Sequence, residues 1–237
     1  MNEEMIKQIT EIVQRALKES GRTDISDADL TAAVVQTVNA YLHTEGEQPP
    51  KKNPLADGAK ADYSSFADAK KGTDPKEVII GVGPAFQRQI RYTINGLSHE
   101  DVLKNIKAGI EEEGMIPRVV KVLDTSDVCF MGLEVAKMSG SGIGIGLQSK
   151  GTVVIHQKDL YPLSNLELFP QAPLMTLEHY RRVGQNAAKY AKGEQVKPIE
   201  CENDPMCRAK YQVKAALMHI LETEQIDPSR PFIEWNV

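Results

Sequence analysis

The chain has 237 residues, of which 41% are hydrophobic and 26% charged, with a net charge of −5. This composition is that of an ordinary globular protein, and the length suits one domain with additions or two small ones. The acidic balance argues against a nucleic-acid partner, which needs a basic face. No apolar run approaches the ~20 residues that span a bilayer, and acidic residues follow Met1 where a signal peptide is basic. We therefore expect a soluble intracellular protein with no membrane partner.

The first 44 residues predict two amphipathic helices. In residues 1–20 the apolar side chains recur at steps of three and four, which places them on one helical face. The second helix covers about residues 26–42, and Ser26 with Asp29 forms a capping-box pattern at its start. Isolated helices of this length are marginal in water, so both apolar faces need a partner.

A linker and one larger domain follow. Residues 45–75 are rich in proline, glycine, lysine and alanine with few apolar residues, which is typical of a flexible linker. Residues 76–237 alternate strand and helix signals. The expected strands are "EVIIGV", "RVVKVL" and the pair in "GIGIGLQSKGTVVIHQ", and the expected helices cover about 98–114, 128–138, 176–192 and 209–224. This order predicts an α/β fold, a Rossmann-like layered domain whose ligands bind at the carboxyl ends of the strands.

The most distinctive stretch is "SGSGIGIGLQSKG", residues 139–151. It fails the Gly-x-Gly-x-x-Gly dinucleotide pattern in all three frames, and no Gly-Lys-Ser/Thr makes it a P-loop. One interpretation is a glycine-rich strand on which a neighbouring backbone packs closely. The other is a backbone-lined wall for a large flat ligand, with Lys150 reaching an anionic group. The spacing alone leaves both open.

No self-contained active site is visible. The sequence has no His-Glu-x-x-His or Gly-x-Ser-x-Gly motif, and no cysteine has a neighbouring histidine. His156 lies in an apolar strand, which is typical of a structural histidine. The glutamate run at residues 111–113 is typical of a solvated helix face. The three cysteines are too few for a disulfide framework or a zinc site; Cys201 and Cys207 could pair only in an oxidising compartment. We predict no catalytic residue and no metal ligand in this chain, and a binding role instead.

Several motifs together carry a family resemblance. They are "KEVIIGVGPAF", "AGIEEEG", "TSDV", "SGSGIGIGLQSKGTVVIHQ", "PLSNLELFPQAPLMTLEHYRRVGQNAAKYAKGE" and "KYQVKAALMHILET", which occur in order over about residues 76–225. Over this span the chain resembles the medium (β) subunit of adenosylcobalamin-dependent diol and glycerol dehydratases. The helix at 26–42 and the last segment, "QIDPSRPFIEWNV", depart from the family pattern.

The resemblance implies a subunit of a heteromeric hydro-lyase. In this family a large (α) subunit, a TIM barrel, carries the substrate and catalytic residues, and it assembles with medium and small (γ) subunits into a dimer of heterotrimers. The medium subunit holds the lower side of adenosylcobalamin (coenzyme B12). An adenosyl radical then starts the conversion of 1,2-propanediol to propionaldehyde or of glycerol to 3-hydroxypropionaldehyde. No Asp-x-His-x-x-Gly motif is present, which agrees with the family's mode, in which dimethylbenzimidazole stays on cobalt.

The resemblance also assigns five cofactor-binding residues. Asp127 is expected to accept from a corrin amide and Lys150 to lie near the nucleotide phosphate, while Asn165, Pro170 and Gln171 border the corrin or its tail. The glycine-rich strand would then lie beside the cobalamin. Simpler roles stay open: Asp127 as a helix N-cap, Pro170 as a helix stop, and Lys150 as a turn residue pointing to water.

Targeting and the alternatives complete these expectations. Family members often use a helix like that of residues 1–20 to enter a bacterial microcompartment, so we expect a cytoplasmic protein inside one, with shell or cargo proteins as partners of that helix. The helix could instead fold back on residues 26–42 as a hairpin. A reactivating factor is a further expected partner. The competing functions are the small subunit of the dehydratase-reactivating chaperone and an independent nucleotide-binding enzyme.

Overall fold

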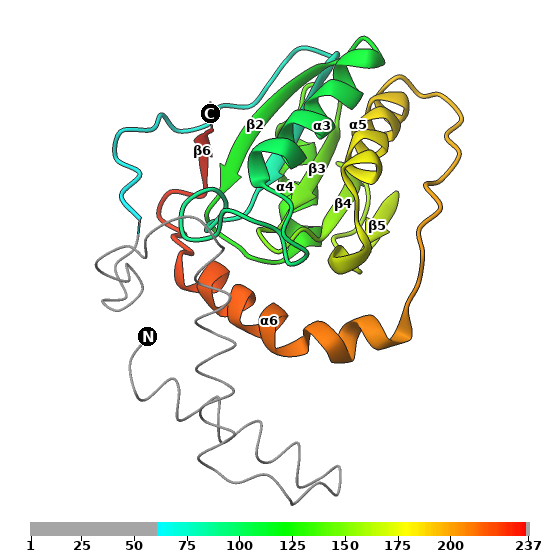
Figure 1. Ribbon diagram of the computed structural model, residues 1–237. Coiled ribbons are helices and arrows are strands. Elements are labelled where there is room, and N and C mark those ends of the chain that lie inside the picture. Colours follow the sequence, from blue (N-terminus) through cyan, green and yellow to red (C-terminus); the bar gives the residue numbers. More distant parts are fainter. Residues whose placement is uncertain (1–60, 236–237) are drawn as a thin grey trace, which may run out of the picture. The chain divides into compact units, whose positions relative to one another are not determined.

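A six-stranded mixed sheet forms the centre of the domain in the computed structural model, which describes residues 61–235. The strands are β1 (Glu77–Val82), β2 (Ile116–Val122), β3 (Ile143–Leu147), β4 (Val153–Gln157), β5 (Glu167–Phe169) and β6 (Phe232–Glu234), in the order β5-β4-β3-β1-β2-β6 (Figure 1). Strands β1, β2 and β3 are parallel, and β4, β5 and β6 join antiparallel to their neighbours.

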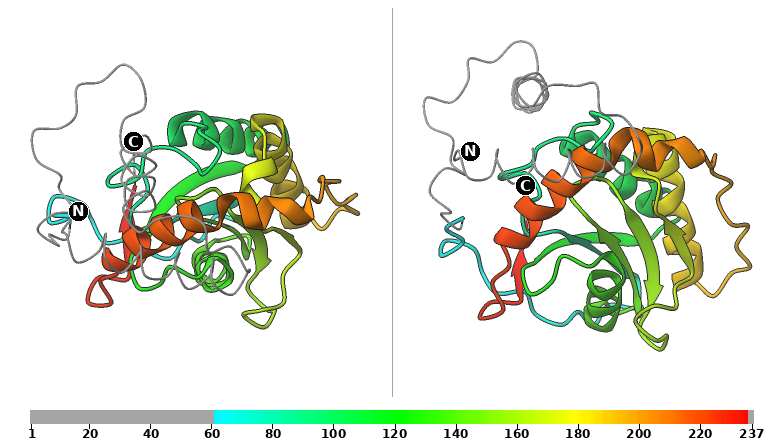
Figure 2. Two further views of the ribbon diagram at one scale, coloured as in Figure 1. Left: turned by 60° about the horizontal axis from the view of Figure 1, so that its bottom comes forward. Right: turned by 90° about the horizontal axis from the view of Figure 1, so that it is seen from below.

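Helices cover both faces of this sheet. They are α3 (His99–Glu112), α4 (Val128–Met138), α5 (Leu177–Ala191) and α6 (Pro205–Glu224), with a short 3-10 turn, η2 (Ala172–Leu174). Helices α3 and α5 pack together on one face and α4 lies on the other (Figures 1 and 2). The predicted α/β fold class with crossover helices is therefore confirmed. The predicted helical segment at residues 1–44 lies outside the described residues.

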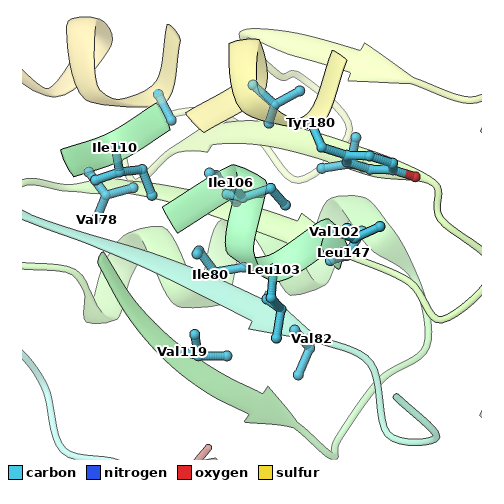
Figure 3. Close-up of a cluster of buried hydrophobic side chains, with 14 of the residues drawn as sticks. Val78, Ile80, Val82, Val102, Leu103, Ile106, Ile110, Val119, Leu147 and Tyr180 are labelled. Atoms are coloured by element: carbon cyan, nitrogen blue, oxygen red, sulfur yellow. The ribbon is translucent and has the colours of Figure 1, made fainter. Parts of the chain in front are cut away.

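The core forms where β1 meets α3. All six residues of β1 are buried. Val78, Ile80 and Val82 point toward the apolar stripe of α3, which includes Val102 and Ile106 (Figure 3). The i, i+3, i+4 spacing on the helix and the alternation on the strand thus meet as the sequence predicts. Each fully buried aliphatic side chain contributes about 1.5–3 kcal/mol to this packing.

The glycines of β3 serve helix packing. A Cβ atom at Gly144 would lie 2.5 Å from Ala136 N, and one at Gly146 would lie 2.5 Å from Val128 O, both on α4. Helix α4 therefore rests directly on the backbone of β3. The expectation of a glycine wall or a flat strand lying against the cofactor is wrong, because α4 already covers that face. Close backbone packing is the interpretation that holds.

Part of the segment assigned to the linker packs on the domain. Tyr63 is buried, and the ring of Phe66 stacks on that of Trp235 with centroids 4.9 Å apart. Asp68 also pairs with Ile233 as an isolated bridge. Composition predicts a linker through residue 75, whereas this part is held by its aromatic contacts and by Arg230, which donates to Tyr63 O, Phe66 O and Asp68 Oδ1. The remaining linker, 45–60, lies outside the described residues.

The last described residues form an element that the sequence did not predict. Residues Phe232–Glu234 make β6, which pairs antiparallel with β2. Upstream, α6 begins at Pro205 rather than near 209, because Asp204 caps it and accepts from Met206 N. Proline at the first helical position lacks a donor that would be unpaired there anyway.

The acidic run at the end of α3 is more than a solvated face. Glu112 pairs with Arg181 of α5, and Glu113 lies 2.9 Å from the Lys192 ammonium. Gly109 and Gly184 let the two helix backbones approach where they cross. The run therefore joins α3 to α5, although exposed ion pairs such as these contribute little to stability.

Candidate functional site

The fold places its ligand edge at the carboxyl ends of β1 and β3. The connection after β1 crosses one face through α3, and the connection after β2 crosses the other through α4. The strand order therefore reverses between β1 and β3, the position where open α/β sheets bind ligands. Helix α6 crosses below this edge (Figure 2). It bonds to loops from three different connections, through Ile94 O, Ser126 Oγ and Ser149 N.

The turn 148–152, between β3 and β4, carries Lys150 and is firmly anchored. Three successive carbonyl oxygens of this turn accept hydrogen bonds from the core. They run from His99 Nε2 to Ser149 O at 2.8 Å, from Ile94 N to Lys150 O at 2.9 Å, and from Tyr180 Oη to Gly151 O at 2.6 Å. Gly151 has φ +102, a conformation that other residues rarely adopt. The backbone of Lys150 is thus fixed before any ligand arrives.

His99 is a structural group in this arrangement. Its Nδ1 accepts from Gln87 N at 3.1 Å, so its Nε2 carries the proton that it donates to Ser149 O. The ring stacks on Phe86 with centroids 3.8 Å apart. Burial is the main cause that lowers the pKa of His99 from 6.5 to about 3. His99 is therefore neutral near pH 7 and holds the turn in place.

The Lys150 side chain is half-buried and has no hydrogen bond or ion pair within residues 61–235. Burial lowers the pKa of its ammonium, while the charges of Glu222 and Asp127 act in the opposite direction. This differs from a turn lysine that simply points to water. A partly desolvated cation on a rigid turn is suited to an external anion such as a phosphate.

Asp127 is the N-cap of α4, which is the simpler of the two roles that the sequence suggests for it. Its Oδ1 accepts from Cys129 N at 2.9 Å and from Phe130 N at 3.1 Å, which starts α4. The residue is exposed, and Oδ2 has no partner within residues 61–235. Gln148 Nε2 donates to Ser126 O at 2.5 Å, which keeps this cap beside the turn of Lys150. Capping leaves one carboxylate oxygen available to a ligand.

Pro170 and Gln171 lie on the same edge. Val153 pairs with Phe169, so Pro170 follows β5 next to the start of β4 and close to turn 148–152. Pro170 is exposed and ends a strand, which is not the helix stop that was considered. The Gln171 amide is engaged elsewhere: Nε2 donates to Asn203 Oδ1 at 2.6 Å and Oε1 accepts from Asp204 N at 3.0 Å. Gln171 thereby holds the start of α6.

Asn165 lies at the other end of β5. Leu166 N donates to Ile155 O, so Asn165 sits near the far end of β4. Leu166 and the three residues of β5 separate it from Pro170. Asn165 is half-buried and has no hydrogen-bond partner among the described residues. The structure thus gathers Asp127, Lys150, Pro170 and Gln171 at one edge, with Asn165 apart from them along the edge strand.

Exposed apolar side chains belong to the elements that carry these residues. They occur in the first turn of α4, in the β4–β5 loop and on β5. Their exposed fractions are 83% for Tyr161, 75% for Leu163, 43% for Phe130 and 39% for Leu168. Phe130 begins α4 at the carboxyl edge, whereas Tyr161 and Leu163 follow β4 at its opposite end.

Sequence reasoning missed two buried charged residues at this edge, Lys121 and Glu222. Lys121 Nζ donates to Phe86 O at 2.5 Å and to Gly83 O at 3.3 Å, and it lies 4.0 Å from the centre of the Trp235 ring. The available signal was a lysine inside the apolar strand "RVVKVL". Glu222 gave no signal, because the apolar spacing around it is that of any amphipathic helix.

The remaining histidine and cysteine residues considered in the sequence have no site of their own among the described residues. His156 is buried, with Nδ1 near Gln157 O and Nε2 near Pro162 O, as a structural histidine should be. All three cysteines are free thiols. In the part of the chain that the structure describes, no His, Cys, Asp and Glu side chains gather as a metal site would. Nor does any helix there have the length and apolarity to cross a membrane.

Comparisons with known proteins identify a family for part of the chain. Residues 83–197 match the family model described as "dehydratase medium subunit", and this part of the chain belongs to that family. Two solved structures are similar to part of the chain. One is "Glycerol dehydratase reactivase" (18% identity, 50% of this chain, 94% of that chain, TM-score 0.42), and the other is "Structure of diol dehydratase-reactivating factor complexed with ADP and Mg2+" (21% identity, 52% of this chain, 98% of that chain, TM-score 0.40). All five sequence-assigned site residues lie inside the family match.

Proposed function

We propose that this chain is the medium subunit of a coenzyme B12-dependent diol dehydratase, acting on 1,2-propanediol, on glycerol or on both. It binds the lower side of adenosylcobalamin with the N-terminus of α4, the turn 148–152 and the edge strand β5. The observation that carries the proposal is the Lys150 ammonium. It lacks a partner within residues 61–235, it stands on a turn anchored at three carbonyls, and it lies inside the segment that belongs to the dehydratase family.

The chemistry of the donor set fits cobalamin. Lys150 offers a positive charge for the nucleotide phosphate, which suits a point charge. Asp127 Oδ2 can accept from a corrin side-chain amide, and the Asn165 amide can donate or accept at the same kind of group. The exposed apolar side chains beside Asn165 and Asp127 suit the apolar parts of the corrin. Pro170 borders the ligand, whereas Gln171 acts mainly by holding the start of α6.

The chain orients the cofactor and excludes water, and it performs no step of the reaction itself. Adenosylcobalamin, when bound, supplies the radical chemistry by which a diol loses water. The anchored turn holds the Lys150 cation in one place, so phosphate binding does not first require loop ordering. We place no catalytic residue here, because the substrate site belongs to the large subunit of such an enzyme.

The assembly follows from the same proposal. The chain joins a large TIM-barrel subunit and a small subunit in a dimer of heterotrimers, and a reactivating factor exchanges spent cofactor in that complex. Residues 1–20 direct the cytoplasmic enzyme into a bacterial microcompartment through shell or cargo proteins. The support for these partners is the family resemblance, together with the apolar helical face in that segment.

The test is co-expression of the chain with large and small dehydratase subunits, followed by loading with adenosylcobalamin. We expect a complex that retains the cofactor and forms aldehyde from at least one diol. A complex without cobalamin, or no complex, would exclude the proposal. A chain that instead promotes cofactor exchange on an assembled dehydratase would be the small subunit of the reactivating chaperone.

A matched pair of lysine variants tests the site itself. Lys150→Ala should weaken cobalamin retention about tenfold or more, since a hydrogen bond to a charged group is worth about 1.5–3 kcal/mol, and should leave the complex assembled. Lys104→Ala, an exposed position on α3, is the control and should change nothing. Equal retention in both variants would remove Lys150 from the site.

A further inference from the structure

The crevice between the carboxyl ends of β1 and β3 is filled by a side chain of this protein. Glu222, in the last turn of α6, is 2% exposed. A Cβ atom at Gly83 would lie 1.5 Å from Glu222 Oε1, so the carboxyl group occupies the space that a side chain at Gly83 would need. The same oxygen accepts from Ser149 N at 3.4 Å. The position where this fold class takes its ligands therefore holds an internal carboxyl group.

Charged and polar groups from three elements face this carboxyl. Lys121 faces it from β2, Lys150 and Ser149 from the turn 148–152, and Tyr63 from the segment before β1. Burial raises the pKa of Glu222 to about 7, while Ser149, Lys121 and Lys150 act in the opposite direction. Glu222 Oε2 and Ser149 Oγ have no hydrogen-bond partner within residues 61–235. The carboxyl is thus close to changing charge near neutral pH.

Glu222 also connects α6 to the residue that the proposed function needs. The Ser149 amide that it accepts from immediately precedes Lys150, and each of the two ionisable groups acts on the charge of the other. The core holds the carbonyl side of this turn through His99, Ile94 and Tyr180. Glu222 engages its amide side.

We propose that Glu222 is a positioning residue, which docks α6 onto the carboxyl edge and sets the place at which Lys150 presents its charge to the anionic ligand. This inference rests on the proposed function. Docking includes the burial of a carboxyl group, so the docked helix favours the protonated acid. The ligand should therefore be held more tightly below neutral pH than above it.

Three variants separate positioning from simple structural support. Glu222→Ala removes the acceptor of Ser149 N, whereas Glu222→Gln keeps the shape and an acceptor oxygen without the charge. Glu224→Ala changes an exposed residue on the same helix and is the control. In the co-expressed complex, below the melting temperature of each variant, we expect about tenfold weaker cobalamin retention for Ala and retention within about twofold of wild type for Gln. Unchanged retention in a folded Glu222→Ala complex would overturn the proposal.

A pH profile provides the second readout. Wild-type retention should fall about threefold between pH 6 and 8.5 as Glu222 ionises, and that of Glu222→Gln should stay level. Identical profiles would overturn the proposal, and this comparison remains decisive if the alanine variant does not fold.

A third readout needs no cofactor. Trp235 is the one tryptophan of the 237 residues, and its ring lies 4.0 Å from the Lys121 ammonium that faces Glu222. Fluorescence of the full-length chain should titrate with a midpoint near the pKa of about 7 of Glu222, and Glu222→Gln should abolish that titration. An unaltered titration would count against Glu222 as the ionising group.

The two proposals fail in distinguishable ways. If Lys150→Ala leaves cobalamin retention intact, the proposed function fails. If Lys150→Ala weakens retention but Glu222→Ala and Glu222→Gln match wild type at every pH, only the positioning role fails.

Discussion

Two lysines at the same edge of the sheet have opposite surroundings. Lys121, on β2, is fully buried and donates to the carbonyls of Gly83, Pro84 and Phe86 beneath the Trp235 ring. Lys150, on the turn after β3, is half-buried and has no partner within residues 61–235. The Lys121 amino group is satisfied by the chain, and the Lys150 ammonium is left for a ligand.

The difference separates a closed region of the edge from an open one. The closed region, built from β1, β2 and the segments at residues 61–70 and 226–235, gives the Lys121 amino group, the Tyr63 hydroxyl and the Trp235 ring N–H acceptors within the chain. The open region, built from the N-terminus of α4, the turn 148–152 and β5, leaves polar atoms and apolar side chains uncovered. Burial lowers the pKa of Lys121 well below its ordinary value, and its hydrogen bonds satisfy the buried amino group. We therefore assign the closed region to stability and the open region to binding.

The largest expected effect is in the closed region. Lys121→Ala leaves Phe86 O without its donor, removes a second donor from Gly83 O and Pro84 O, and opens a cavity beneath Trp235, so it should lower the free energy of unfolding by about 4 kcal/mol. Urea denaturation followed by far-UV circular dichroism measures this loss. A loss below 1 kcal/mol would show that the hydrogen bonds of Lys121 to these carbonyls are not required for stability.

Acid should cause the next largest loss of stability, through His99, which holds the turn 148–152 of the open region. His99 is neutral in the fold with a pKa of about 3 and has an ordinary value of 6.5 when unfolded. The unfolded chain therefore binds the additional proton as pH falls below 6.5, and about 3 kcal/mol of stability should be lost between pH 7.5 and 4. The comparison is with His99→Gln, whose unfolding free energy should vary less with pH over that window. Parallel curves for the two proteins would contradict this role.

A paired substitution of aromatic residues should give a smaller effect. Trp235→Leu removes the ring over Lys121 and should cost about 2 kcal/mol. Phe130→Leu, at a side chain that is 43% exposed at the N-terminus of α4 in the open region, should cost less than about 1 kcal/mol. Equal losses in thermal unfolding would remove the distinction between the two regions.

The smallest expected effect is that of Lys150 on stability. Lys150→Met keeps the apolar stem and removes a cation that burial disfavours. The free energy of unfolding, measured by urea denaturation, should therefore stay within about 0.5 kcal/mol of wild type. A large destabilisation, with cobalamin retention unchanged, would move Lys150 from the open region to the closed one.

The sequence predicts the local elements well and the covering segments poorly. Periodicity and capping residues such as Ser98 and Asp127 locate α3 and α4, because those signals are local. Strand β6 and the packing of Tyr63 and Phe66 depend on partners far away in the chain, and no local pattern encodes them. The glycines of β3 illustrate the same limit: their spacing indicates a close approach but does not say whether a ligand or α4 makes it.

Some residues of the candidate site could be found from the sequence, and others only from the structure. The family resemblance supplied Asp127, Lys150, Asn165, Pro170 and Gln171, and their binding roles remain predictions. The structure adds why Lys150 is available and shows that the Gln171 amide is already occupied. Glu222 could not be found from sequence, because its importance comes from meeting Gly83 and Ser149, which are more than 70 positions away in the chain.

Strand β6 has a consequence for how the protein behaves at high concentration. By pairing with β2, it occupies backbone donors and acceptors on that side of the sheet, which would otherwise be free to pair with a strand from another molecule. On the opposite side, β5 is only three residues long and is followed directly by Pro170, which has no amide hydrogen to donate. Shortness and proline are both ways in which natural sheets discourage edge-to-edge aggregation.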